Sequence, residues 1–169
     1  MSSILNTLLS KVEAVKDGLQ SGALVRGVVS THPDDVLEMQ RIQLLEGKTP
    51  TGQDIHPYYS EDLKPEGHFH SVESAGRYAA WKQNLSYPYS VERNPDAPNL
   101  YINGRFHSEI DVDFREDAAV IVPGTGYADG IMLKYPGAFG LSRESWNTIF
   151  STRGVLAELM GEIKSILYE

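Results

Sequence analysis

The chain has 169 residues, 41% of them hydrophobic, with no cysteine and a net charge of −8 from 23 acidic and 15 basic residues. This length fits a single domain over residues 1–169, and the missing cysteines exclude disulfides and thiolate metal sites. The basic residues are scattered, which argues against a protein that grips the DNA backbone through a basic face. No apolar run reaches the roughly 20 residues of a membrane span, and the N-terminus lacks the pattern of a secretion signal. We therefore expect a soluble protein, folded in a reducing cytosol, with no membrane partner.

Helical periodicity dominates the chain up to Gly47. Leucine, isoleucine and valine recur at helical spacing over residues 2–20, which predicts an amphipathic helix. Residues 23–29 predict a second short helix, with a strand as the alternative, because nearby glycines weaken the pattern. Thr31 is expected to cap a third helix, with Asp34 at the capping-box distance. Gly47 is predicted to end this helix, because glycine favours the left-handed position at a helix C-terminus.

Two long irregular segments, about residues 48–70 and 84–98, are rich in proline and glycine. Loops of this length within a compact domain are usually functional or bind a partner. Between them, Ser71 is predicted to begin a short helix. One face of this helix consists of Ala75, Tyr78, Ala79 and Lys82.

An alternating pattern predicts a β-hairpin over about residues 107–122. Acidic and apolar side chains alternate along its first strand, so one face is apolar and the other carries only acids. A charged turn at residues 115–117 then leads into a second strand over residues 118–122. The apolar positions are Ile110, Val112 and Phe114, and the acidic positions are Glu109, Asp111 and Asp113.

Two more helices are predicted near the C-terminus. Pro136 and Gly137 favour a loop after the hairpin, and Ser142 is expected to cap the helix that follows. Apolar residues at helical spacing from Val155 to Leu167 predict the last helix. This order of elements indicates an α+β fold, in which a small antiparallel sheet packs with N- and C-terminal amphipathic helices. Because two strands alone are marginally stable, we expect assembly with other copies.

The residues His32, Pro33, Asp34 and Asp35 resemble the His-Pro-Asp-Asp-Glu signature of zinc-dependent N-deacetylases of the LmbE type. That resemblance implies zinc binding by His32 and an aspartate, with the neighbouring aspartate as the base. However, Val36 stands in place of the glutamate, no His-x-x-His follows, and the parallel strands of those enzymes are missing. Acids at the start of a helix explain the same residues. We therefore predict no catalytic residue and keep a zinc-dependent hydrolase centred on this motif as the alternative.

Two other groups of residues have the chemistry of cation ligands. His68 and His70 place two imidazoles on one side of an extended segment, and folding could bring His56 or His107 to them as a third ligand. The acids of residues 111–117 lack the central glycine and the closing glutamate of a calcium loop. Exposed loop and strand positions are the preferred interpretation of both groups. We accordingly predict no metal, no cofactor and no enzymatic activity.

Aromatic residues concentrate in or beside the long loops. Aromatic side chains are enriched at protein interfaces, because they supply contact area at a low entropic cost. The same side chains could instead anchor the long loops to their own domain, and both interpretations remain open. The candidates are Tyr58, Tyr59, Trp81, Tyr87 and Tyr89.

Two blocks of the sequence resemble virion proteins of tailed phages. The first contains Leu37-Glu38-x-x-Arg41-x-Gln43-Leu44-Leu45-x-Gly47, Thr51-Gly52 and Arg77-Tyr78-Ala79-x-Trp81-Lys82. This block resembles small virion proteins encoded by phages and prophages of the crAss-like and related kind. The second runs from Asn103-Gly104 through Ser108, Ile110 and Tyr127-Ala128 to Phe139-Gly140-Leu141-Ser142. Its layout is similar to that of phage virion-morphogenesis or tail-completion proteins.

The resemblance implies a structural, non-enzymatic subunit of an oligomeric ring in the head–tail connector, neck or tail-completion region. Its partners would be copies of itself and the portal, neck and tail proteins; it would be made in the host cytoplasm and reside in the virion. An acid-only strand face would let DNA pass nearby without specific binding, because like charges repel. Glu109, Asp111 and Asp113 are therefore expected to face DNA or a partner. A soluble phage-encoded adaptor is a further alternative.

Overall fold

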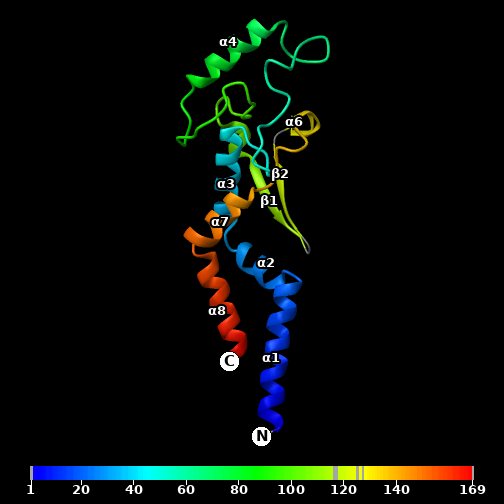
Figure 1. The fold of residues 1–169 in the computed structure, drawn as a ribbon, viewed down its shortest axis with the longest axis vertical. Helices are drawn as coiled ribbons and strands as arrows, with labels where there is room; N and C mark the ends of the chain where they lie inside the picture. Colours follow the sequence, from blue (N-terminus) through cyan, green and yellow to red (C-terminus); the bar gives the residue numbers. More distant parts are fainter. Residues whose placement is uncertain (1, 116–117, 125, 127, 169) are drawn as a thin grey trace.

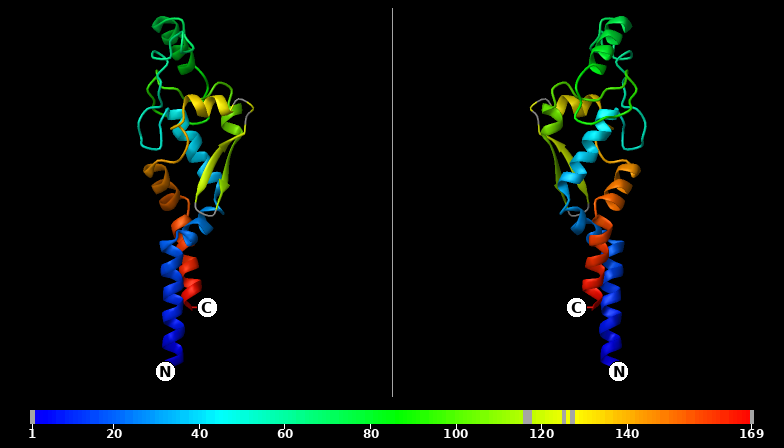
Figure 2. Two further views of the ribbon diagram at one scale, coloured as in Figure 1. Left: turned by 90° about the vertical axis from the view of Figure 1, so that its right-hand side faces the viewer. Right: turned by 90° about the vertical axis from the view of Figure 1, so that its left-hand side faces the viewer.

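The computed structural model describes residues 2–115, 118–124, 126 and 128–168 (Figure 1). Its elements in chain order are α1 (Ser2–Gln20), α2 (Ala23–Val29), α3 (Pro33–Glu46), α4 (Val72–Gln83), α5 (Arg105–Ser108), β1 (Ile110–Phe114), β2 (Ala119–Pro123), α6 (Ala128–Lys134), α7 (Arg143–Thr152) and α8 (Val155–Tyr168). Helices α1 and α8 lie side by side and project from a body that holds the hairpin and α3, with α4 at the opposite end (Figure 1 and Figure 2).

Strands β1 and β2 pair as an antiparallel hairpin, with Ile110 opposite Pro123 and Phe114 opposite Ala119. Along β1 the apolar side chains are buried or half-buried, while the two aspartates between them are exposed. This two-stranded sheet packs with β1 against α3 and lies at the side of the body, between α6 and α2 (Figure 2). The predicted α+β class is therefore confirmed.

The hairpin differs in its bounds from the predicted range of 107–122. Residues 107 and 108 belong to α5, and Glu109 follows this helix as its C-terminal cap rather than opening the strand. The second strand begins at Ala119 and extends to Pro123. Residues 116 and 117 of the predicted turn lie outside the described part of the chain.

Helix α3 lies at the centre of the hydrophobic core. Its side chains Val36 and Leu44 are fully buried, and the helix packs against β1 and α7. Ile110 from β1 and Ile149 from α7 join them in one continuous cluster. This shared cluster links the hairpin to the C-terminal helices. Burial of each such side chain stabilises the fold by about 1.5–3 kcal/mol.

Two buried glutamines of α3 hold the segment that leads into α7. The Gln43 side-chain amide donates to the carbonyl of Gly140 and accepts from the backbone N–H of Ser142, both at 2.8 Å. Gln40 Oε1 accepts from the backbone N–H of Gly140 at 2.8 Å. Ser142 in turn caps α7 by accepting from the N–H of Ser145. The two side-chain amides thus serve as hydrogen-bond partners for the backbone of this segment, which does not belong to a β-strand.

Replacing Gln43 with leucine should destabilise the fold by about 1–3 kcal/mol, because the partly buried groups of Gly140 and Ser142 would lose their partners. Urea unfolding would measure this loss. The same change at Gln83, which is exposed on α4, is the control and should cost less than about 0.5 kcal/mol. Equal effects at the two positions would contradict this role of Gln43.

The helix signals are largely confirmed. Helices form over residues 2–20 and 23–29 and from Val155 onward. Gly47 adopts the left-handed conformation at the end of α3, and Ser71 forms a capping box with Ser74 at the start of α4. Among the described residues, none of the helices combines the length and the apolar composition that a membrane crossing requires.

Two local predictions are wrong. The N-cap of α3 is His32 rather than Thr31, whose hydroxyl instead donates back to the carbonyl of Val28. Asp34 does not complete a capping box, because Asp35 is the acid that bonds to the cap residue, through the His32 ring. After the hairpin, helix α6 forms where Pro136 favoured a loop. This proline comes after the last residue of α6, so it limits the length of the helix without preventing it.

Candidate functional site

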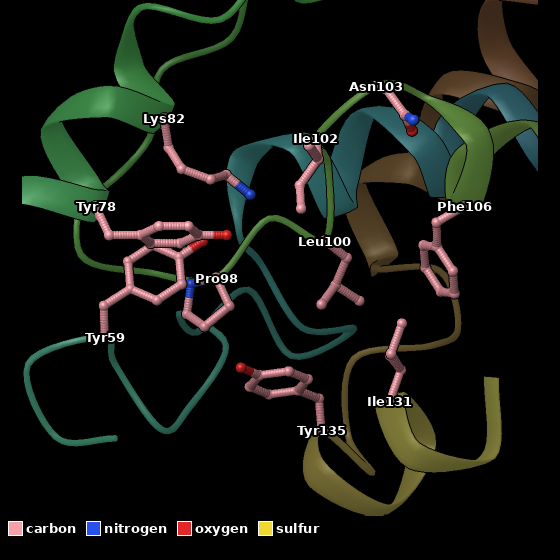
Figure 3. Close-up of a pocket in the computed structure, with 10 residues that line it drawn as sticks. All are labelled: Tyr59, Tyr78, Lys82, Pro98, Leu100, Ile102, Asn103, Phe106, Ile131 and Tyr135. Carbon is pink, nitrogen blue, oxygen red and sulfur yellow. The ribbon is translucent and has the colours of Figure 1, made fainter. Parts of the chain in front are cut away.

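A cavity of about 350 Å³ lies between α4, the segment before α5, and α6 (Figure 3). Its apolar wall consists of Pro98, Leu100, Ile102, Phe106 and Ile131. Its polar side chains are Lys82 and Asn103 together with the phenols of Tyr59, Tyr78 and Tyr135. None of the described residues that line it is acidic.

Packing between α4 and the first long loop places Lys82 in this cavity. Ala75 and Ala79 are small enough for the rings of Tyr59 and Phe69 to pack closely on α4, and these four residues form a separate apolar cluster. The Tyr59 and Phe69 rings meet edge to face, with centroids 6.0 Å apart. Lys82 follows Ala79 on the same buried face, so its side chain enters the space beside the cluster.

Lys82 is only 2% exposed, although its side chain ends in an ammonium group. Its Nζ lies 5.9 Å from the ring centroids of both Tyr59 and Tyr78, a contact between a cation and two π faces. Figure 3 shows the ammonium group extending past these rings toward the cavity. Burial, with a smaller effect from the Arg93 guanidinium, lowers the pKa of Lys82 to about 7. Among the described residues, no carboxylate forms an ion pair with it.

Several buried polar atoms in this part of the molecule have no hydrogen-bond partner among the described residues. Arg93 donates to the hydroxyl of Tyr87 at 3.1 Å and to the carbonyl of Ala97 at 2.9 Å, but its buried Nε has no partner in the described part of the chain. The buried Nδ2 of Asn99 is likewise without a partner there. Burial lowers the pKa of His107 to about 4, so this ring is neutral at pH 7.

The cavity phenols also remain neutral. Burial raises the pKa of Tyr59, Tyr78 and Tyr135 above the ordinary value of a phenol. The negative charge of Asp62 also raises the pKa of Tyr135, and Asp62 itself forms an ion pair with Lys134. The cavity therefore presents an ammonium group that has no carboxylate partner among the described residues, together with several neutral polar groups, against an apolar wall.

The residues of the hydrolase alternative lie elsewhere, where α3 meets α8. The two ring nitrogens of His32 bond to Asp35 and to Glu158 of α8, each at 3.0 Å, and the hydrogen bond to Asp35 raises its pKa above the ordinary value. Arg153 forms ion pairs with Asp35 and with Glu38. Asp34 is exposed. These contacts connect the start of α3 to α8 and occupy both imidazole nitrogens, one of which a zinc ion would need.

The other histidines do not converge on one point. His56 pairs with Glu61, His70 lies within hydrogen-bond distance of Lys64, and the buried His107 bonds to the carbonyl of Asn99. His68 is exposed. Within the described ranges, no three histidine, aspartate or glutamate side chains are arranged to hold a metal ion.

The predicted acidic face is only partly a strand face. Asp111 and Asp113 are exposed on β1, and Asp113 pairs with Arg115 at 2.8 Å. Glu109 lies before the strand and pairs with Arg105 of α5. Two of the three acids therefore share one face of the hairpin.

Several of the predicted interface aromatics make contacts within the molecule. Tyr59 is buried against Phe69, Tyr58 donates to Asp54, and the hydroxyl of Tyr87 donates to the backbone carbonyl of Lys82. Tyr89 is half-buried. Trp81 is 46% exposed. Contact of these aromatic residues with a partner protein thus stays a prediction. Of the five, Trp81 has the most exposed side chain.

A second candidate surface is the apolar face of the projecting helices. We define the α1 stripe as Ile4, Leu5, Leu8, Leu9 and Val12, all of them exposed. Ile4 is 78% and Leu5 59% exposed. The helical spacing in this region was readable from the sequence, but its exposure was not. A groove of about 270 Å³ between α1 and the end of α8 is lined in part by Ile4 and Leu8 of the stripe and by Leu167.

Comparisons of the chain with protein-family models, curated proteins and solved structures gave no match.

The burial of Lys82 makes a testable contribution to the pH dependence of stability. Its pKa of about 7 in the folded protein lies below the unfolded value of about 10.4, so the unfolded chain binds one more proton between these values. Stability should therefore rise with pH over this window, by up to about 1.4 kcal/mol per pH unit from this group. Urea unfolding at about pH 7.5 and about pH 9.5 would measure the rise.

A Lys82→Met variant should lose that rise, whereas Lys64→Met should retain it, because Lys64 is exposed. An identical pH dependence in wild type and Lys82→Met would show that the ammonium is not desolvated in the folded protein.

Proposed function

We propose that the protein is a structural, non-enzymatic subunit of an oligomeric ring in a phage virion, in the head–tail connector, neck or tail-completion region. The observation that carries this proposal is the α1 stripe on the projecting helix pair. Contiguous apolar surface on a folded protein is typical of an interaction site. The resemblance of the two sequence blocks to virion and tail-completion proteins supports the same class.

The geometry of the stripe suits a helix from a neighbouring copy. Its members recur three and four residues apart, so they form one continuous face of α1. Helix α8 packs along α1, and Leu167 of α8 shares a groove with Ile4 and Leu8, but the stripe side chains remain exposed. Helix α8 itself exposes Leu156 and Met160. A neighbouring helix packed on both would bury these side chains, and repetition of a head-to-tail contact closes a ring.

The acids of the hairpin fit a ring that surrounds DNA. Asp111 and Asp113 are exposed on the hairpin, away from the stripe on the projecting helices (Figure 1). A lumen lined with carboxylates keeps DNA mobile, because it repels the phosphate backbone. We assign this face to the lumen as part of the proposal.

Substitution of the stripe tests self-assembly. Leu5→Glu combined with Leu9→Glu should convert the ring to a monomer, because charged side chains would have to be buried in the interface. Both leucines lie outside the groove between α1 and α8, so their replacement should leave the fold intact. Native mass spectrometry over a concentration series would measure the change, and circular dichroism would verify the helix content.

Leu133→Glu is the matched control, because Leu133 on α6 is 85% exposed and lies outside the stripe. This variant should assemble like the wild type. A wild-type chain that is monomeric at every concentration, or a double variant that still forms rings, would contradict ring formation through the stripe. A one-to-one complex with another phage protein would favour the adaptor alternative.

The lumen assignment has its own test. Electron cryomicroscopy of the assembled ring should place Asp111 and Asp113 on the inner surface. Replacing both with lysine should leave the copy number unchanged and produce salt-sensitive DNA retention, since the new charges attract phosphate. If the map places both residues on the outside of the ring, the DNA-facing role is wrong.

A further inference from the structure

The cavity around Lys82 is a feature that ring assembly does not use. It lies at the α4 end of the molecule, whereas the α1 stripe is at the opposite end (Figure 1). Its volume of about 350 Å³ is at the lower end of the roughly 300–1,000 Å³ typical of small-molecule sites. The lining combines an apolar wall with a few polar groups, which is the usual composition of such sites.

The charge of the cavity selects the ligand. Lys82 is only 2% exposed, and its side chain reaches the cavity. It has no acidic partner among the described residues. A buried ammonium without a counter-charge is costly, and an anion of matching size would remove that cost. Arg93 lies close enough to act electrostatically on Lys82, so the local charge is positive and a cationic ligand is disfavoured.

The wall determines the rest of the ligand. Leu100, Ile102 and Ile131 offer apolar surface, which an inorganic anion such as phosphate would leave uncovered. We propose that this cavity binds a small monocarboxylate with an apolar body, its carboxylate at Lys82 Nζ and its apolar part against Leu100, Ile102 and Ile131.

Phenols flank the same position. Tyr59 and Tyr78 line the cavity beside Lys82, and Tyr135 enters it from the side of α6 (Figure 3). Because their hydroxyls remain protonated, they can donate hydrogen bonds to a carboxylate. The ligand thus meets donors from α4, from the first long loop and from the residue that follows α6.

Binding should be coupled to protonation of Lys82. The carboxylate pairs with the ammonium and not with the neutral amine, so it raises the pKa of Lys82 from about 7. Affinity should consequently fall as pH rises above 7, by up to about tenfold per pH unit. The other groups around Lys82 do not reproduce this fall: Arg93 stays charged, His107 is already neutral, Tyr59, Tyr78 and Tyr135 stay protonated, and Asp62 is paired with Lys134.

Octanoate is the probe, with 1-octanol and octylamine as ligands of the same apolar body and different charge. Isothermal titration calorimetry on the full chain should detect octanoate binding at pH 7 at least tenfold tighter than that of octanol, and no octylamine binding. The Lys82→Met substitution should lower the affinity for octanoate at least tenfold and leave the affinity for octanol unchanged. The Lys64→Met variant should bind both ligands like the wild type. NMR of the lysine ε-carbons should show the Lys82 resonance returning to its protonated position when octanoate is added.

Equal affinity for octanoate and octanol would overturn the proposal, as would octanoate binding that Lys82→Met leaves intact. Absence of octanoate binding to the wild type would overturn it as well. Octanol binding to Lys82→Met shows independently that the variant retains its cavity. These results do not bear on ring assembly, which the substitutions in α1 test separately.

Discussion

Helix α3 must bury apolar side chains and satisfy two buried amides at the same time, and the rest of the fold depends on how it does both. Leu44 and Val36 require cover from β1 and α7. Gln40 and Gln43 require hydrogen-bond partners, which the backbone around Gly140 and Ser142 supplies. A buried amide without a partner costs as much as a lost apolar contact, so the two requirements select the same arrangement. The path of the chain from the hairpin into α7 follows from this pair of constraints.

The two ends of the molecule present different chemistry. The projecting helices carry apolar side chains that stay exposed in the described part of the chain, and such surface is typical of interaction sites. The opposite end encloses an ammonium group without a counter-charge in a cavity of moderate size. The His32 contacts with α8 lie between them and connect α3 to the projecting pair. The proposed assembly and the proposed ligand binding can therefore be tested separately.

Local sequence signals were reliable where a single hydrogen bond or backbone conformation decides the outcome. Ser71 and Ser142 cap their helices as predicted, and Gly47 ends α3 in the left-handed conformation. Thr31 failed because the preceding helix α2 offered its hydroxyl a carbonyl, which left the cap position to His32. Helix α6 was missed because its side chain Ile131 and the adjoining Tyr135 pack on segments distant in sequence, and this packing outweighs the short length of the helix.

The sequence by itself determined the α+β class, the alternation along β1 and the apolar stripe on α1, because each depends on residue periodicity alone. Only the tertiary structure decided that the stripe stays exposed and that Lys82 is enclosed. Exposure depends on what the rest of the chain brings to a surface, and α8 covers only one side of α1. The surroundings of Lys82 come from Tyr59, Arg93 and Tyr135, which lie in three segments far apart in the chain. The position of Lys82 on α4 was predictable, but the lack of a counter-charge was not, since charge compensation depends on distance in space rather than in sequence.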